Sequence, residues 1–468
     1  MTMKNHRTIG FTSLCIAFFL VMLDTTLVPF LYPILISNLE ISIGEAAAVN
    51  NFYLIAYAGS LLLGGVLGDI WYRKYIFLLG VFLLGIGSFI AVFNGAYMPL
   101  LAGRFTMGIG AGLITPQSMA FISKLFDEDE RAGAFGIWAA VAGLGTALGP
   151  VVAKVSANVG SWEPAFWINV ILAGITFILA GKYLDNPQSK KYFNIRKIIT
   201  VSLLGMATMA MISSLQLSDL HSDSKPAFES YILIIIAIIL CIITWFFVKY
   251  IGYPPIIQTK KIDFKPYISA VLSSACLGGA LTAYYLPLSI SFEFQLKFDE
   301  LSTISLLVLC SLMNSIFGLL AGKLSNKYGC KRLIIIGLLI FASACFLFSI
   351  FLSIPEINRY LAIGCAALLI SLVGIGAGLA FGPLANSAMS AASIETIGEA
   401  AAFYNWMRQV FSAAGGVIAA LIFSKLFYGS NLSEAQTINY SSIVGFIFSG
   451  TLLMAGVIFC KGIRNEKS

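Results

Sequence analysis

Long apolar runs, each about the length of a membrane-spanning helix, fill most of this 468-residue chain. A helix needs about 20 mostly apolar residues to cross a bilayer. Short polar loops separate the runs and leave no room for a sizeable soluble domain. The pattern predicts an all-α membrane protein with fourteen transmembrane helices. These predicted spans are residues 10–36, 48–70, 75–94, 98–120, 134–156, 164–184, 195–215, 230–251, 266–289, 302–325, 332–354, 358–382, 399–425 and 440–463.

The composition agrees with this pattern and excludes several classes of protein. Hydrophobic residues make up 59% of the chain and charged residues 11%, whereas soluble domains carry about 25% charged residues. The net charge of +7 arises in short loops and does not indicate nucleic-acid binding. The chain has only two histidines and no paired cysteine spacing, so we expect neither a metal site nor a cofactor.

No catalytic or ATP-binding motif stands out. The chain lacks GxxxxGK[ST], and no zinc motif or nucleophile elbow is present. We therefore expect a protein that is not an enzyme and that draws its energy from an ion gradient.

The basic residues predict the orientation, because lysine and arginine concentrate in cytoplasmic loops. An even number of spans places both termini on one side. If that side is the cytoplasm, 22 of the 29 basic residues are cytoplasmic and five lie at the outer face. Arg104 and Arg408 are the remaining two, and both fall inside predicted spans. The bias predicts that both termini are cytoplasmic.

The chain also repeats itself. GIGAGLITP at 108 recurs as GIGAGLAFGP at 374, GGVLGDIWYRK at 64 as AGKLSNKYGCKR at 321, and AFGIW at 134 as AFYNW at 402. These pairs equate spans 2, 4 and 5 with spans 10, 12 and 13. Two parallel six-span halves are typical of a transporter with its binding site between the halves. We predict an N-terminal bundle at 1–185, a two-helix insert at 186–262 and a C-terminal bundle at 263–468.

Five motifs carry a resemblance that covers essentially the whole chain. They are LDTTLVPFLYP in span 1, GGVLGDIWYRK after span 2, LLAGRFTMGIGAG in span 4, GLGTALGPVVAK in span 5 and GEAAAFYNWMRQVFSAAGG in span 13. In this order and on these spans, they resemble the fourteen-span drug:proton antiporter branch of the major facilitator superfamily. The resemblance implies the major facilitator fold, two six-helix bundles with a two-helix insert.

Asp24 is the only charged side chain between residues 10 and 36. A charge at the centre of a span costs about 2.5–3.5 kcal/mol on insertion scales, so such groups usually have a function or a partner. The resemblance places spans 1 and 4 along one cavity, which pairs Asp24 with Arg104. We predict that this pair couples transport to protons. The alternative is a static ion pair that fixes helix packing.

The loop after span 2 carries Gly65, Asp69, Arg73 and Lys74. The resemblance implies a gate at the cytoplasmic face, held closed by Asp69 and Arg73. The simpler interpretation is that the basic residues only anchor a short inner loop. In the second copy Asn326 stands where an acid is expected, which predicts a weaker gate there.

Span 5 contains Gly145, Gly149 and Pro150, and small residues four apart allow helices to approach closely. The resemblance links this motif to exporters; tight helix packing is part of its role in either case. Lys154 follows one turn later, near the outer end. It either snorkels to the interface or offers a cation to anionic substrates at the cavity mouth.

Span 13 carries Asn405, Arg408 and Gln409, which we predict to face the substrate cavity. Arg408 could bind a substrate carboxylate or phosphate through two parallel hydrogen bonds. It could equally form a structural pair with Glu399.

We therefore expect a proton-coupled exporter of amphipathic small molecules or drugs in the cytoplasmic membrane. Its partners would be protons, substrate and lipid, with a periplasmic adaptor left open. Because two arginines and Lys154 suit anions, the alternative substrate is an anionic metabolite such as a carboxylate siderophore. A channel or a non-transporting sensor is a different class of answer, and the internal repeat argues against a channel.

Overall fold

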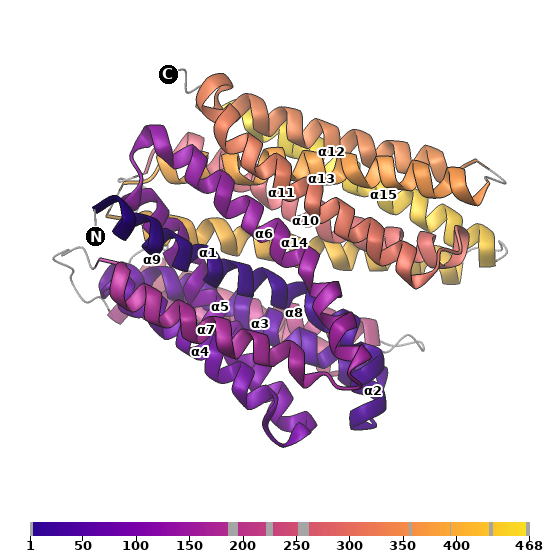
Figure 1. Ribbon diagram of the computed structural model, residues 1–468, viewed down its shortest axis with the longest axis horizontal. Helices are drawn as coiled ribbons and strands as arrows, with labels where there is room; N and C mark the ends of the chain where they lie inside the picture. The colour runs from indigo at the N-terminus through magenta and orange to yellow at the C-terminus, as the bar shows by residue number, and fades with distance from the viewer. Residues whose placement is uncertain are drawn as a thin grey trace. The chain divides into compact units, whose positions relative to one another are not determined.

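The computed structural model describes residues 3–185, 195–220, 228–250, 262–354, 358–393, 395–429 and 434–464. Within these ranges the chain is helical apart from turns and one isolated bridge between Ile262 and Ala392. Figure 1 shows the helices with their labels.

The helices of the N-terminal part are α1 (Met3–Leu27), α2 (Tyr32–Leu39), α3 (Ile43–Ile70), α4 (Arg73–Ala91), α5 (Tyr97–Leu125), α6 (Glu128–Asn158) and α7 (Glu163–Tyr183). The remaining α-helices are α8 (Ile195–Leu220), α9 (Phe228–Tyr250), α10 (Phe264–Ile290), α11 (Glu300–Tyr328), α12 (Cys330–Leu352), α13 (Arg359–Ser390), α14 (Ile397–Gly429) and α15 (Glu434–Phe459). Short 3₁₀ or π segments lie at Val28–Leu31, Phe93–Gly95, Ser291–Gln295 and Cys460–Gly462.

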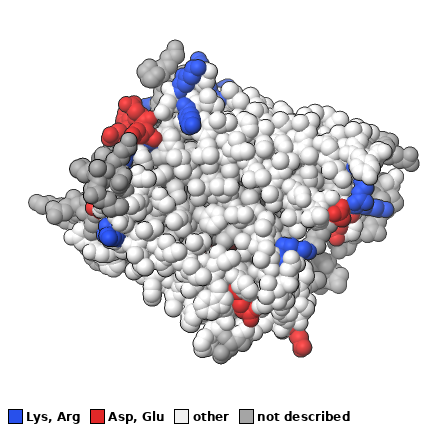
Figure 2. Space-filling model, viewed as in Figure 1, with Lys and Arg blue, Asp and Glu red and all other residues white. Residues whose placement is uncertain are grey.

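Thirteen of the fourteen predicted membrane spans are matched, in the described ranges, by helices of sufficient length and apolar composition to cross a membrane. The eighth predicted span corresponds to a shorter apolar helix, Ile232–Phe246. On the face shown in Figure 2, most charged side chains lie over the helix ends, and the surface over the helix middles is uncharged. This distribution is what a lipid environment requires, since a charged side chain at membrane depth is costly.

The first span is interrupted where its sequence requires it. Pro29 and Pro33 lack backbone N–H groups, and the chain passes from α1 through a 3₁₀ turn into α2 around them. Both parts lie within one membrane-length segment, His6–Leu39. Asp24 falls in the last turn of α1, just before this break.

Contacts divide the chain into two compact units. Unit 1 is Met1–Asp127, Leu148–Asp263 and Ala392–Trp406, so it contains both helices of the predicted insert and the first turns of α14. Unit 2 is Glu128–Ala147, Phe264–Ala391 and Met407–Ser468. The division into bundles at 185 and 263 stays a prediction.

The repeated GIGAG segments pack in the same way in each unit. In unit 1, a Cβ added at Gly110 would lie 2.6 Å from the carbonyl oxygen of Gly80, so α5 and α4 touch through their backbones. In unit 2, a Cβ at Gly376 would lie 2.6 Å from the carbonyl oxygen of Gly337, which joins α13 to α12. The alternate glycines of each segment face α3 in unit 1 and α11 in unit 2. The repeat therefore encodes close helix packing.

Candidate functional site

Asp24 and Arg104, which the sequence pairs across α1 and α5, meet in the interior of unit 1. Arg104 Nη1 lies 3.4 Å from Asp24 Oδ1, and both side chains are fully buried. Asn169 of α7 donates from Nδ2 to the same oxygen over 2.8 Å. We call Asp24, Arg104, Asn169 and Tyr53 the inner cluster.

Arg104 is held by more than the carboxylate. Its Nε donates to the carbonyl oxygen of Val49 over 3.2 Å, and its Nη2 donates to the carbonyl oxygen of Asp24 over 3.3 Å. The guanidinium carbon lies 4.2 Å from the ring centroid of Tyr53, within the range of a cation–π contact. Tyr53 is itself fixed because its hydroxyl donates to the carbonyl oxygen of Val21. The arginine therefore keeps several partners whatever the charge of Asp24.

The two carboxylate oxygens of Asp24 differ. Oδ1 accepts from Arg104 and Asn169, whereas no described residue donates to the buried Oδ2. A proton on Oδ2 would leave Oδ1 free to accept the Asn169 hydrogen bond as a carbonyl oxygen. The site can hold either a carboxylate or a carboxylic acid without losing that bond.

A second group of charges lies where α3 ends and α14 begins. Asp69 pairs with Arg73 through Oδ1, and its Oδ2 accepts from the backbone N–H of Glu399 over 2.8 Å. An acid at the N-terminus of a helix satisfies an open donor and interacts favourably with the helix dipole. Asp69 thereby ties the start of α14 to the end of α3.

Lys197 at the start of α8 completes this group. Its Nζ pairs with Glu399 Oε1, and both side chains are more than nine-tenths buried. We call Asp69, Arg73, Glu399 and Lys197 the end cluster. The carboxylate of Glu399, which the sequence suggested as a possible partner of Arg408, pairs with Lys197.

The other residues of the predicted gate lie beside the end cluster. A Cβ on Gly65 would collide with Ala402 and with the carbonyl oxygen of Gly398, so glycine lets α3 and α14 touch. Lys74 follows Arg73 in the first turn of α4 and is half-buried. The structure therefore brings three of the four predicted gate residues to the α14 contact.

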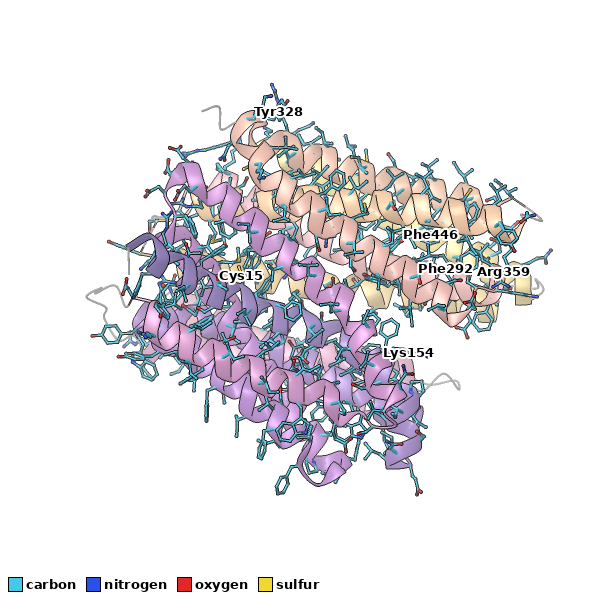
Figure 3. The ribbon with its side chains drawn as sticks, viewed as in Figure 1. Cys15, Lys154, Phe292, Tyr328, Arg359 and Phe446 are labelled. Atoms are coloured by element: carbon cyan, nitrogen blue, oxygen red, sulfur yellow. The ribbon has the colours of Figure 1, made fainter. Side chains whose placement is uncertain are left out.

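The predicted exporter motif lies in α6, which continues through Pro150 without ending. A Cβ on Gly149 would lie 3.0 Å from the backbone nitrogen of Leu27, so this glycine sets the approach of α6 to the end of α1. Gly145 is buried one turn earlier. Lys154 is exposed near the C-terminal end of the helix, as Figure 3 shows.

The three predicted cavity residues of α14 have different surroundings. Asn405 is buried, and its Nδ2 donates to Ala401 O over 2.8 Å and lies 2.9 Å from Met119 Sδ. Arg408 and Gln409 are half-buried. The guanidinium carbon of Arg408 lies 5.0 Å from the ring centroid of Phe381. Phe381 in turn stacks on Trp138, with centroids 5.5 Å apart.

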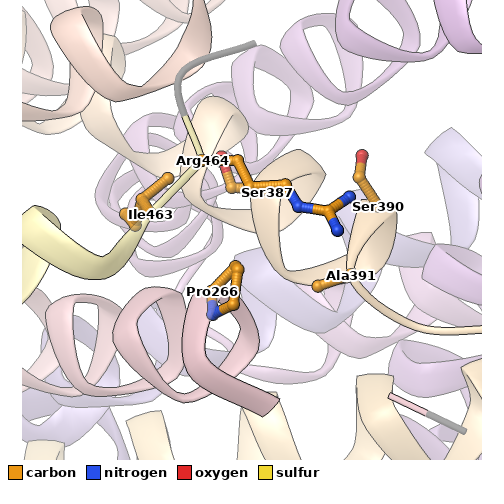
Figure 4. A pocket seen from close by; sticks show the side chains of 6 residues that line it. All are labelled: Pro266, Ser387, Ser390, Ala391, Ile463 and Arg464. Atoms are coloured by element: carbon orange, nitrogen blue, oxygen red, sulfur yellow. The ribbon is translucent and has the colours of Figure 1, made fainter. Parts of the chain in front are cut away.

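A small pocket lies at one end of unit 2, where α10 begins and α13 ends (Figure 4). It holds about 10 Å³, room for roughly one water molecule. Its lining is Pro266, Ser387, Ser390, Ala391, Ile463 and Arg464, which includes none of the predicted cavity residues.

Two members of these clusters escaped the sequence analysis. Asn169 carries a usable signal, because it is the only amide in the apolar run from 164 to 184. Lys197 carries none, since it stands with other basic residues at the very start of the predicted span 195–215 and reads as an ordinary cytoplasmic cation there. Neither position reveals its partner without the folded chain.

Known proteins resemble this chain over most of its length. The family model described as Major Facilitator Superfamily matches residues 14–416. A methylenomycin A resistance protein of Bacillus subtilis is 24% identical over 419 residues, which are 87% of this chain and 86% of that protein. A triacylglyceride transporter of Mycolicibacterium smegmatis is 26% identical over 444 residues, which are 90% of this chain and 76% of that protein.

A solved structure shows the same fold. The human organic anion transporter MFSD10 matches this chain with a TM-score of 0.65 over 96% of this chain and 99% of its own. The two sequences are 16% identical, so this likeness concerns the arrangement of helices alone.

Proposed function

This chain belongs to the major facilitator superfamily of transporters, and from that premise we propose that it is a proton-coupled exporter of amphipathic small molecules or drugs. We place it in the cytoplasmic membrane with both termini inside, as the basic residues predict. We also propose that twelve helices form the two six-helix bundles and that α8 and α9 are the insert.

The observation that carries the proposal is the asymmetry of the Asp24 carboxylate. Oδ1 has two donors, while Oδ2 is buried and no described residue donates to it. An ionisable group at membrane depth is a functional candidate by default, and proton relays commonly use carboxylates. Oδ2 supplies a place for the proton, and the other contacts of Arg104 hold that cation when Asp24 becomes neutral.

The proposed cycle exchanges one charge on Asp24. Facing outward, Asp24 takes up a proton at Oδ2, and substrate is released. After the protein turns inward, Asp24 loses the proton to the cytoplasm, and substrate binds again. Arg104 stays in place throughout, because Val49 and Tyr53 hold it independently of the carboxylate charge.

Two observations support two different classes of substrate. The resistance protein of Bacillus subtilis favours a drug or another amphipathic molecule. The half-buried guanidinium of Arg408, placed over Phe381, favours the second candidate, an anionic metabolite such as a carboxylate siderophore. Both candidates use the same proton exchange at Asp24.

The test measures proton efflux from everted vesicles that contain the protein and an acidic interior. One panel of cationic drugs and one of carboxylate metabolites are added to wild type, Asp24→Asn and Asp127→Asn. Asp127 is an exposed acid outside the inner cluster and serves as the matched control. We expect one panel to drive proton efflux in wild type and in Asp127→Asn, and Asp24→Asn to lose at least about 100-fold in rate, as for a missing general acid–base group.

The outcomes separate mechanism from substrate. A response to the carboxylate panel alone selects the second candidate. Undiminished proton efflux in Asp24→Asn contradicts Asp24 as the proton carrier. Substrate movement without any proton movement contradicts coupling itself.

A further inference from the structure

Helix α8, the first helix of the predicted insert, is packed directly against α3. A Cβ on Gly205 would collide with the carbonyl oxygen of Gly59, so the two backbones touch at this point. Met209, one turn further along α8, fills the space in front of Gly59 from the same side. Such a backbone contact between small residues is typical of helices that stay together in a membrane.

The same helix also contacts the first turns of α14. Val201 of α8 and Ala402 of α14 share one buried apolar cluster with Leu62 and Val66 of α3. Further along, Trp406 Nε1 donates to Thr208 Oγ1 over 2.9 Å. Helix α8 therefore holds α3 with one part of its surface and the start of α14 with another.

Lys197 adds a charged contact to this packing. The backbone N–H of Glu399 is bound by Asp69 of α3, and the side chain of Glu399 is bound by Lys197 of α8. One residue of α14 is thus held from two helices. The four charges of the end cluster balance, since two are acids and two are bases.

We propose that Lys197 is a positioning residue of the gate, through which the two-helix insert holds the start of α14 against α3. The insert is then a working part of the gate, and α14 can leave α3 only when the Lys197–Glu399 pair separates. The part of this statement that concerns transport rests on the proposed function; the part that concerns the local contact does not.

Removal of Lys197 has a defined consequence. The buried carboxylate of Glu399 loses its partner and stays close to the second acid of the cluster, Asp69. An unpaired buried charge is strongly unfavourable, so the closed contact at the start of α14 becomes less populated. Removal of both Lys197 and the charge of Glu399 relieves this imbalance.

The experiment is hydrogen exchange, read by mass spectrometry, on the full chain in lipid nanodiscs. Peptides covering 397–406 are compared in wild type, Lys197→Met, Lys197→Arg, Glu399→Gln and the double variant that combines Lys197→Met with Glu399→Gln. Arg196→Met is the matched control, because Arg196 is the adjacent base and is exposed. Trp406→Phe is a second probe of the α8–α14 contact, in case Lys197→Met does not fold.

We expect Lys197→Met to speed exchange in 397–406 by about tenfold or more, the effect of losing a hydrogen bond to a charged group. Arg196→Met should match wild type, and Lys197→Arg should restore protection. The double variant should exchange more slowly than the sum of the single effects predicts, because the pair acts as a unit. Trp406→Phe should give a smaller increase in the same peptides.

Two results would overturn the proposal. One is exchange in 397–406 that is unchanged in Lys197→Met. The other is a uniform increase over all helices, which would make Lys197 a contributor to general stability. Neither measurement needs substrate or a proton gradient, so their outcome is independent of whether the exporter proposal holds. In vesicles, Lys197→Met should change the rate of transport per protein molecule. The number of protons exchanged per substrate molecule should stay that of wild type.

Discussion

The ends of α3 and α11 carry the two copies of one motif, and they differ in charge. At the end of α3, Asp69 is buried and binds Arg73 and the backbone N–H of Glu399. At the end of α11, Asn326 is exposed, and its Nδ2 donates to the carbonyl oxygen of Asp129 in α6 over 2.8 Å. Each end contacts the start of another helix, α14 in unit 1 and α6 in unit 2.

The glycines are shared by the two copies. Gly65 faces Gly398 and Ala402, and Gly322 faces Ala132 and Gly136. Close approach of the helices is therefore common to both ends, whereas the buried ion pairs belong to the first. The comparison teaches that small residues create the contact and that charge decides how firmly it is held.

The largest expected effect comes from making the first copy chemically like the second. Asp69→Asn turns one of the two accepting oxygens into an NH2 donor, so either the Arg73 bond or the Glu399 N–H bond is lost, and the buried arginine is left without its carboxylate. Hydrogen bonds to charged groups contribute about 1.5–3 kcal/mol, so we expect transport to fall by about tenfold or more. Initial rates of substrate uptake into everted vesicles measure this.

Asn326→Ala is the matched change in the second copy. It removes one exposed hydrogen bond between neutral groups, which lies at the low end of the usual range of about 0.5–1.5 kcal/mol because water can replace it, and should lower the rate about two- to threefold. Equal losses in Asp69→Asn and Asn326→Ala would break the comparison, because charge would then not distinguish the two ends.

A smaller effect is expected from adding a methyl group at the shared glycines. Gly65→Ala forces α3 away from α14 and should destabilise the protein by about 1–3 kcal/mol, as overpacking does. Gly322→Ala should be milder, since its Cβ would lie 3.0 Å from Ala132 O and could be accommodated by small shifts. Thermal unfolding midpoints in detergent measure both. If Gly322→Ala were the more damaging change, the first copy would not be the tighter contact.

The smallest effect is expected from an exposed pair, Asp299 and Arg359, which shows what burial adds. Arg359 Nη2 donates to Asp299 Oδ1 over 2.8 Å, and both side chains are more than half exposed. Figure 3 labels Arg359 at the start of α13. Asp299→Asn keeps a residue that can cap α11 and removes only the charge, so we expect the unfolding midpoint at pH 7 to stay within experimental scatter.

The pH dependence of this pair has a definite sign. Hydrogen bonds from Ser302, with a smaller contribution from Arg359, hold the pKa of Asp299 below its usual value. The stabilisation is therefore present above the unfolded-state pKa of about 3.9 and is lost as the pH falls through the lower folded-state value. Unfolding midpoints of wild type and Asp299→Asn should therefore agree within scatter at pH 7 and at every lower pH down to 3, because any small advantage of the wild-type carboxylate can only shrink as it is protonated. If the unfolding midpoint of Asp69→Asn is measured in the same way, an equal lowering in Asp299→Asn at pH 7 would show that burial does not separate the two pairs.

The sequence by itself determined the elements and their repetition. Lipid leaves a chain of apolar runs little choice but helices, because the backbone must satisfy its own hydrogen bonds there. The positions of Asp24 and Arg104 within spans 1 and 4 were visible as charges in apolar runs. The paired GIGAG segments predicted equivalent packing, since closely spaced glycines on one helix have few other uses.

Only the tertiary structure decided which side chains meet. Asn169 lies 145 residues from Asp24, and no spacing rule links α7 to α1. Lys197 was one of several basic residues near the start of a predicted span, and only the fold pairs it with Glu399, a residue of the next-to-last α-helix. Helical periodicity assigns a residue to a face of its own helix, but the neighbour of that face is set by packing among all the helices. The partners of the buried charges therefore follow from the packed helices of unit 1.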